Sequence, residues 1–378
     1  MNILFLSDVS LDIVGGAQES MKVIMQGLKN KYNFKIVTPK NNRKYDFDVI
    51  ELKEYNNLTL RGKKIIDIIK IIKNLDTIIK TNNINIIHVQ MPSTMLLIGI
   101  MKAFKLINSN IKIIYTDRGV LNKYKKKTYY GIKVFSTLFL KIVLTTNSNK
   151  KLYQDMLNIN KNKLDVIYNT AGEIFEKYED EKRIVNREKL KFSVKDKVVM
   201  FAGRFSKEKN WTLALDIVKE LPNDAKVIIA LGSNKTPDNI LRCKEFIETL
   251  EYYVGKENIR SYIDISLNEI NNLYYASDIF ILTSSTESFG RTAIEAMSRK
   301  NVVYGTNIDG LKEVIGFKEN LYTTKEEIIL KINQIINNEQ KLNEEKCKFY
   351  DRFNDTFTLE KNLKSYDYLY QNLKGGED

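Results

Sequence analysis

The chain has 378 residues with 43% hydrophobic content, four prolines and 17 glycines, which favours two packed domains and argues against a disordered protein. The opening apolar run meets Asp8 and the run at 95–104 is broken by Lys102, so we expect neither a signal peptide nor a membrane-spanning helix. Residues 1–168 carry 28 Lys and Arg against 12 Asp and Glu, a net charge of +16, whereas the remainder carries −3.

Strands and helices are predicted to alternate through the first half. Strands are expected at 2–7, 34–38, 47–52, 86–89, 111–116, 142–145 and 164–168. Helices are expected at 17–30, 63–81, 94–106 and 148–157, the second with Ile65, Ile68, Ile69, Ile72 and Ile79 facing inward. This alternation predicts a parallel sheet covered by helices on both faces.

Two loops of this half carry candidate site residues. Gly15 and Gly16 separate the first strand from the first helix, and such glycines either let a ligand approach the backbone or simply form a tight turn. Asp117 and Arg118 follow the strand at 111–116, at the edge where parallel sheets bind ligands. The basic segment LNKYKKKTYY at 121–130 is either a contact for anionic lipid headgroups or an exposed loop.

A polar, acidic stretch divides the chain. We expect a first domain over 1–170, a linker over 171–185 and a second domain over 186–355. In the second half, strands are expected at 198–202, 226–231, 259–263, 278–283 and 302–304. Helices are expected at 211–220, 239–253, 267–276, 291–299, 325–337 and 350–372. The terminal helix, from about 356 to 373, is expected to pack back on the first domain.

Charged residues gather in two loops of the second half. Arg204 and Lys209 lie five apart after the strand at 198–202, and their guanidinium and ammonium groups suit a diphosphate. Glu287 and Glu295 flank the start of the helix at 291–299, an amino end that suits phosphate. The two acids either complement the helix dipole, worth about 0.3–1 kcal/mol, or accept hydrogen bonds from sugar hydroxyls.

Taken together, these segments resemble retaining glycosyltransferases of the GT-B fold, most closely glycosyltransferase family 4, the glycosyl transferases group 1. The resemblance covers almost the whole chain and rests on four motifs: E-x7-E at 287–295, G-R-x-x-x-x-K at 203–209, leu-tyr-x-x-ala-asp at 273–278, which appears as L-Y-Y-A-S-D, and G-G-A at 15–17. It implies an α/β protein with two facing Rossmann-like domains, parallel sheets, and a donor and acceptor cleft between the domains.

The implied reaction is sugar transfer with retention at the anomeric carbon, from a nucleotide diphosphate sugar. UDP-sugar is favoured, and the expected acceptor is lipid-linked or a glycan in cell-surface polysaccharide or glycoconjugate biosynthesis. By the resemblance, Arg204 and Lys209 neutralise the diphosphate, Glu295 binds the ribose and Glu287 contacts the transferred sugar. Breaking the glycosyl–phosphate bond places negative charge on the diphosphate, which such cations stabilise.

The remaining implied contacts surround the same donor. The amides at Phe289 and Gly290 would hold phosphate or sugar, and Arg291 would add a phosphate contact. Gly15 and Gly16 would let the diphosphate approach from the other domain. No cofactor or metal is expected.

The sequence departs from the family pattern at one catalytic position. Arg118 stands where many members carry a histidine, so Arg118 and the adjacent Asp117 are included among the catalytic candidates. The only histidine, His88, is expected to serve the core or a strand end.

Two alternatives stay open: a GT-B sugar-nucleotide epimerase, and a non-catalytic donor-binding partner of an active transferase. The basic first half favours contact with an anionic membrane surface, and no nucleic-acid module is recognisable. Cys243 and Cys347 have no metal-ligand spacing and indicate reduced thiols. We therefore expect a cytoplasmic protein, or one peripheral to the inner face of the plasma membrane.

Overall fold

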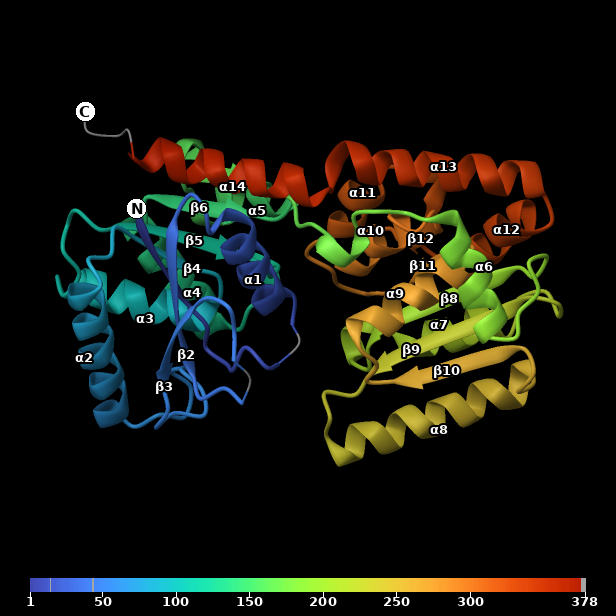
Figure 1. Ribbon diagram of the computed structural model, residues 1–378, viewed down its shortest axis with the longest axis horizontal. Coiled ribbons are helices and arrows are strands. Elements are labelled where there is room, and N and C mark those ends of the chain that lie inside the picture. The colour runs from blue at the N-terminus through green and yellow to red at the C-terminus, as the bar shows by residue number, and fades with distance from the viewer. Residues whose placement is uncertain (14, 43, 375–378) are drawn as a thin grey trace. The chain divides into compact units, whose positions relative to one another are not determined.

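The computed structural model describes residues 1–13, 15–42 and 44–374, which form two compact units (Figure 1). Unit 1 comprises Met1–Asn169 and the residues from Glu360 onward, and unit 2 comprises Thr170–Leu359. Unit 1 is therefore built from both ends of the described chain, whereas unit 2 is continuous. Among the helices that the structure describes, none is long and apolar enough to cross a membrane.

Unit 1 contains a seven-stranded parallel sheet in the order β3-β2-β1-β4-β5-β6-β7. Its strands are β1 (Asn2–Leu6), β2 (Asn33–Pro39), β3 (Asp48–Leu52), β4 (Ile86–Val89), β5 (Lys112–Asp117), β6 (Lys141–Leu144) and β7 (Leu164–Val166). The central strands are almost continuous apolar runs, as buried parallel strands require, and their carboxyl ends meet at one edge.

Helices cover both faces of this sheet (Figure 1). One core joins the sheet to α2 (Ile65–Thr81), α3 (Pro92–Ala103), α4 (Lys126–Phe135) and α5 (Asn147–Leu157). The opposite core joins it to α1 (Gly16–Leu28) and to the terminal helix α14 (Leu359–Lys374). Tyr370 of α14 packs against Tyr32 and His88, so α14 completes the second face.

Unit 2 contains a six-stranded parallel sheet in the order β10-β9-β8-β11-β12-β13. Its strands are β8 (Val198–Arg204), β9 (Lys226–Gly232), β10 (Ile259–Ile263), β11 (Ile279–Leu282), β12 (Val302–Thr306) and β13 (Leu321–Tyr322). Its helices are α6 (Asp180–Lys189), α7 (Trp211–Val218), α8 (Pro237–Val254), α9 (Leu267–Ala276), α10 (Arg291–Met297), α11 (Asp309–Ile315), α12 (Lys325–Ile336) and α13 (Glu339–Thr356).

The predicted linker over 171–185 has a different structure. It lies within unit 2 and includes the start of α6. Asp278 receives ion pairs from Arg183, from Arg187 at 2.6 Å and from Lys346 of α13. The carboxylate also accepts the Val198 amide at 2.8 Å, so one buried acid fastens the polar segment to the sheet.

Helical segments also differ from the sequence predictions. The buried face of α2 is Ile71, Leu75 and Ile79, whereas Ile65 and Ile69 are exposed. Isoleucines surround this helix, so apolar spacing alone does not select its inner face. The basic segment 121–130 enters a helix, α4, and the predicted long terminal helix is broken between α13 and α14.

Candidate active site

Two loops of unit 2 meet beyond the carboxyl ends of the adjacent strands β8 and β11. The Ser285 amide donates to the Glu208 carbonyl at 2.8 Å, and the Thr283 hydroxyl donates to the Lys209 carbonyl at 2.7 Å. These bonds fix the loop after β8 to the loop before α10. The crevice at this edge is where open parallel sheets bind ligands.

Lys209 and Glu287 form an ion pair within this loop pair. Their Nζ and Oε2 atoms lie 2.7 Å apart, and each side chain is 19% exposed. The Ser284 hydroxyl also donates to Oε2 of Glu287, at 3.4 Å. The structure therefore brings a predicted diphosphate cation and a predicted sugar-contacting carboxylate into direct contact.

Glu295 is buried on α10 with two partners of its own. Its Oε1 lies 3.3 Å from Nε of Arg291, and its Oε2 accepts from the Tyr274 hydroxyl at 3.3 Å. Burial raises the pKa of Glu295, against the opposing effects of Arg291, Tyr274 and Lys209. Arg291 is anchored by donating to the Ala171 carbonyl at 2.9 Å.

The turn into α10 depends on glycine. Gly290 has a φ of +89°, which disfavours other residues, and an added Cβ would lie 2.5 Å from Cδ2 of Leu311. Phe289 is buried and packs edge-on against Phe357, with ring centroids 5.8 Å apart. The side chain of Phe289 therefore anchors the loop, which leaves only its backbone for the contact that the sequence predicts.

Arg204 ends β8 and is exposed, while its carbonyl accepts from the Trp211 indole at 2.9 Å. The loop thus holds the arginine backbone and leaves the guanidinium at the surface. Gly203 lies beside the Lys209 side chain, because a Cβ added there would lie 3.4 Å from it, in van der Waals contact.

In unit 1, Arg118 lies at the carboxyl end of β5 within a dense hydrogen-bond network. Its Nε donates to Oε1 of Gln90 at 2.9 Å, and its other nitrogens donate to Asn169, Ser20 and Tyr366. These four partners come from four separate segments of unit 1. The arginine therefore ties the strand edge to α1 and α14.

Asp117 is enclosed on the other side of the same strand end. Its carboxylate accepts from the Gly119 amide at 3.0 Å, from the Tyr153 hydroxyl at 2.6 Å and from the Tyr124 hydroxyl. Its relative exposure is 0%, so the carboxylate serves internal contacts of unit 1.

The two glycines before α1 differ in what surrounds them. A Cβ on Gly16 would meet no atom within 4 Å, whereas one on Gly15 would lie 2.4 Å from Oε1 of Gln18. Open space at Gly16 is compatible with the predicted ligand approach. Val14, beside them, lies outside the described residues.

His88 is a core residue. Its Nδ1 lies 2.8 Å from the Tyr370 hydroxyl and its Nε2 lies 2.7 Å from the Thr116 hydroxyl. Burial and the nearby charge of Arg118 lower the pKa of His88 to about 3, so the ring is neutral.

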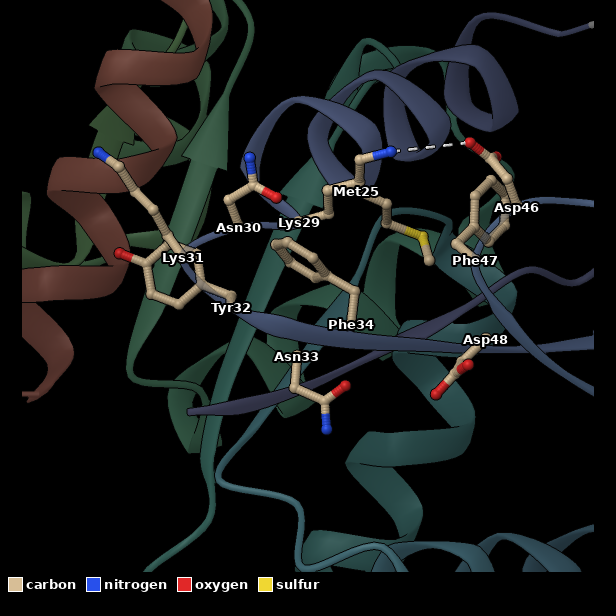
Figure 2. Close-up of a pocket in the computed structure, with 10 residues that line it drawn as sticks. All are labelled: Met25, Lys29, Asn30, Lys31, Tyr32, Asn33, Phe34, Asp46, Phe47 and Asp48. Atoms are coloured by element: carbon tan, nitrogen blue, oxygen red, sulfur yellow. Dashed lines mark ion pairs between the residues drawn. The ribbon is translucent and has the colours of Figure 1, made fainter.

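A separate pocket of about 360 Å³ lies beside α1 and β2 in unit 1 (Figure 2). Lys29 and Asp46 form an ion pair at its rim, at 3.9 Å, above Met25 and Phe34. It contains none of the predicted site residues. Among the described residues, no group of three or more His, Cys, Asp or Glu side chains is placed to hold a metal ion.

Two family models match this chain. The model described as "Glycosyl transferases group 1" matches residues 182–351, and the one described as "Glycosyltransferase Family 4" matches residues 14–171. The chain belongs to the family 4 glycosyltransferases. Each match falls largely within one structural unit, so the family assignment rests on both halves of the chain.

Two curated relatives are about a quarter identical to this family 4 glycosyltransferase over the residues that align. It is 27% identical to a 41.2 kDa protein in the cps region of Klebsiella pneumoniae, over 63% of this chain and 64% of that protein, slightly less than two thirds of its length. It is 25% identical to the glycosyltransferase MJ1178 of Methanocaldococcus jannaschii, over 95% of each chain.

Solved structures show the same fold across the full chain. A sucrose-phosphate synthase from Thermosynechococcus elongatus superposes with a TM-score of 0.83 at 16% identity, covering 100% of both chains. HepE of Anabaena, solved in complex with UDP and glucose, superposes with a TM-score of 0.78 at 16% identity. The superposition covers 98% of this chain and 99% of that one. The family 4 glycosyltransferase has the GT-B fold, as predicted.

Sequence reasoning on this family 4 glycosyltransferase missed the partners that hold the predicted site residues. Tyr274 binds Glu295, and Ser284 binds Glu287, yet neither received a role. Tyr274 lies within the leu-tyr-x-x-ala-asp motif, so the motif contained the signal. Ser284 is the second residue after β11, and only the folded loop shows what it contacts.

Proposed function

We propose that this glycosyltransferase moves a sugar from a nucleotide diphosphate sugar, with UDP-sugar favoured and with retention at the anomeric carbon. The observation that supports it most is the Lys209–Glu287 pair at the β8 and β11 strand ends, beside buried Glu295. A cation and two carboxylates at one crevice match the charges of a diphosphate and the hydroxyls of two sugars. The UDP and glucose bound to HepE support the choice of donor.

In this proposal Arg204 and Lys209 neutralise the departing diphosphate, with the backbone of Phe289 and Gly290 and the Arg291 side chain beside them. Glu287 contacts the transferred sugar, and Glu295 accepts from the ribose hydroxyls. Gly15 and Gly16 leave room for the diphosphate from unit 1. Because these cations supply the positive charge, we propose that no metal ion is required.

Arg118 and Asp117 act in this proposal through position. Each is held by several partners within unit 1, and Arg118 in turn orients Gln90. We therefore propose that Arg118 and Asp117 are positioning residues, which hold the carboxyl edge of the unit 1 sheet in the shape that substrate meets.

The proposed acceptor is a lipid-linked or glycan molecule of cell-surface polysaccharide or glycoconjugate biosynthesis. The relative in the cps region of Klebsiella pneumoniae supports this pathway. The proposed location is the cytoplasm, with reversible attachment to the inner face of the membrane.

A basic and apolar surface of unit 1 supports that attachment. Packed helices α3 and α4 and the segment after α4 present exposed apolar side chains at 40–74% exposure: Phe104, Leu106, Tyr130, Val134, Leu138 and Leu140. The exposed lysines among them are Lys105, Lys123, Lys125, Lys126, Lys127 and Lys133. Lysines near an anionic surface each contribute about 1 kcal/mol, and apolar side chains enter the headgroup region.

A donor panel tests the catalytic proposal. Thermal unfolding with UDP-glucose, UDP-galactose, UDP-N-acetylglucosamine, GDP-mannose and ADP-glucose should show stabilisation by at least one, about 2.7 kcal/mol at 100 times its Kd. NMR of slow donor hydrolysis should show the released sugar first in the donor's anomeric form, with EDTA present. Binding without hydrolysis or transfer would indicate the non-catalytic alternative, and donor isomerisation the epimerase.

A further inference from the structure

Tyr274 is a buried tyrosine of α9 whose hydroxyl contacts the carboxylate of Glu295. The hydroxyl donates to Oε2 at 3.3 Å, and Tyr274 is 0% exposed. Among the described residues, no other group donates a hydrogen bond to that carboxylate. A buried tyrosine hydroxyl needs a partner, so the contact serves either the fold alone or the orientation of Glu295 as well.

The ring of Tyr274 is itself fixed by its neighbours. It packs edge-on against Phe280 of β11 and against Phe175, with ring centroids 5.3 Å and 6.2 Å away. The Tyr274 carbonyl accepts from Nδ2 of Asn301 at 2.8 Å. Burial, together with the charge of Glu295, raises the pKa of Tyr274 well above its ordinary value of 10, so the hydroxyl keeps its proton. Glu295 therefore faces a hydrogen-bond donor that the core of unit 2 holds in place.

These contacts restrict the rotation of the Glu295 carboxylate. The last torsion of a glutamate side chain is broad, so a carboxylate without partners turns readily. Tyr274 holds Oε2, while Oε1 lies 3.3 Å from Nε of Arg291, so both oxygens have a fixed neighbour. A carboxylate offers about four acceptor positions, and the tyrosine takes one of them. The others can accept two adjacent hydroxyl groups at once when the plane of the carboxylate is held.

We propose that Tyr274 is a positioning residue, which holds the Glu295 carboxylate in the plane that accepts both ribose hydroxyls of the donor nucleotide. This inference rests on the proposed function, because that function gives Glu295 its contact with ribose. It makes Tyr274 a determinant of the preference for a ribonucleotide over its 2′-deoxy counterpart, which offers only one of the two hydroxyls. The competing role is structural, and the hydrogen bond would then stabilise unit 2 without affecting ribose recognition.

Calorimetry on the full chain at pH 7.5 compares UDP, ADP and GDP, each with its 2′-deoxy counterpart. In wild type, the ribonucleotide that binds most tightly should bind about tenfold more tightly than its deoxy form, as one hydrogen bond to a charged acceptor predicts. Tyr274→Phe removes only the hydroxyl. It should weaken binding of the ribonucleotide about fivefold and leave the deoxy form nearly unchanged, so that the ratio of the two affinities falls to about two.

Tyr275→Phe is the matched control, from the next position of α9. The Tyr275 hydroxyl donates to the Lys177 carbonyl at 3.1 Å and accepts from the Glu179 amide at 3.3 Å, and neither partner is a predicted site residue. Loss of this hydroxyl should lower Tm and leave the affinity ratio at its wild-type value. An equal fall of the ratio in both variants would overturn the inference, because the loss of any buried hydroxyl would then suffice.

A double-mutant cycle tests whether Tyr274 acts through Glu295. In the Glu295→Gln background, Tyr274→Phe should leave the affinity for the same ribonucleotide unchanged, since the carboxylate that it positions is absent. Equal weakening in both backgrounds, or an unchanged ratio in Tyr274→Phe, overturns the inference. Tyr274→Met also lacks the hydroxyl and takes the place of Tyr274→Phe in these measurements if that variant does not fold.

The outcomes distinguish this inference from the proposed function. A wild-type protein that binds no nucleotide sugar and no nucleoside diphosphate overturns the donor proposal and the inference with it. A wild-type preference for ribose that persists in Tyr274→Phe overturns the inference alone. Equal binding of both forms by wild type refutes the ribose contact of Glu295, and therefore the inference, while phosphate binding by Lys209 is unaffected.

Discussion

Lys209 and Glu287 lie 2.7 Å apart in a crevice where both are expected to contact the donor. A diphosphate that binds Lys209 competes with Glu287 for the ammonium group, which leaves the carboxylate available to the transferred sugar. We predict that Lys209→Ala lowers kcat/KM for transfer by about 10²–10³, since it removes a cation that stabilises the leaving group.

Lys207→Ala is the matched control for this variant, because Lys207 is exposed in the same loop. Steady-state kinetics should show near wild-type transfer for that control. Equal activity in wild type and Lys209→Ala, with unfolding unchanged, would contradict a role for Lys209 in catalysis.

We predict that Glu295 makes UDP binding by this protein pH-dependent. Burial raises its pKa, so the carboxylate protonates above the ordinary value of 4.5 as pH falls, and a protonated acid no longer accepts two ribose hydrogen bonds. UDP affinity measured by calorimetry should therefore weaken toward acid pH in wild type. Glu295→Gln should bind UDP about tenfold more weakly at neutral pH and remove that dependence. An identical acid dependence in both proteins would rule out Glu295 as its source.

Asp278 connects α6, α13 and β8 through one buried carboxylate. Asp278→Ala leaves the buried Arg187 without the carboxylate that pairs with its charge and should lower the free energy of unfolding by about 3–5 kcal/mol in urea titration. Asp216→Ala is the control, because its pair with Lys219 is half exposed, and a change within about 0.5 kcal/mol is expected.

The ion pairs of Asp278 also make the free energy of unfolding depend on pH in acid. Arg183, Lys346 and Arg187 hold the pKa of Asp278 well below its ordinary 3.8 despite burial. The stabilisation is therefore present above pH 3.8 and is lost as pH falls further. A stability curve for Asp278→Asn that parallels wild type below pH 4 would contradict this.

The burial of His88 predicts that the free energy of unfolding also depends on pH in a milder range. Its pKa is about 3 in the folded protein against an ordinary 6.5, so the unfolded chain binds a proton in this window and the folded chain does not. Wild type should lose about 2 kcal/mol of stability between pH 6.5 and 5 relative to His88→Gln, which cannot titrate. Urea titrations at the two pH values measure it, and equal losses in both proteins would show that His88 is charged when folded.

The lysines at the amino end of α4 predict salt-sensitive membrane binding. Replacing Lys125, Lys126 and Lys127 with Gln should weaken sedimentation with phosphatidylglycerol vesicles at low salt about 100-fold, at about 1 kcal/mol for each lysine. The control replaces the exposed Lys189, Lys191 and Lys195 of unit 2. An equal loss in both triple variants would indicate net charge alone.

Sequence patterns predicted most strands of both sheets, because buried parallel strands are short apolar runs between polar loops. The motif residues Glu287 and Lys209 could be placed on neighbouring loops for the same reason. The direct contact between Glu287 and Lys209 could not be predicted, since it depends on the order of the strands in the folded sheet. Asp278 was assigned to a strand and Arg187 lay beyond a predicted linker, and only folding brings their charges together.

Two unpaired polar atoms of unit 1 were also invisible in the sequence. Asp8 and Gln90 are 82 positions apart. That Oδ1 of Asp8 and Nε2 of Gln90 lack a hydrogen-bond partner among the described residues becomes apparent only when every hydrogen bond around them is assigned. The prediction of the inner face of α2 was wrong for a different reason. Apolar residues surround that helix, so their spacing does not single out one face.

The return of α14 to unit 1 sets an order of events during synthesis. Unit 2 is one continuous segment and emerges from the ribosome before the helix that completes unit 1. Until then His88 lacks Tyr370 and Arg118 lacks Tyr366. The second unit can therefore mature first, and a nascent chain stalled before residue 360 would present an unfinished amino-terminal sheet to chaperones.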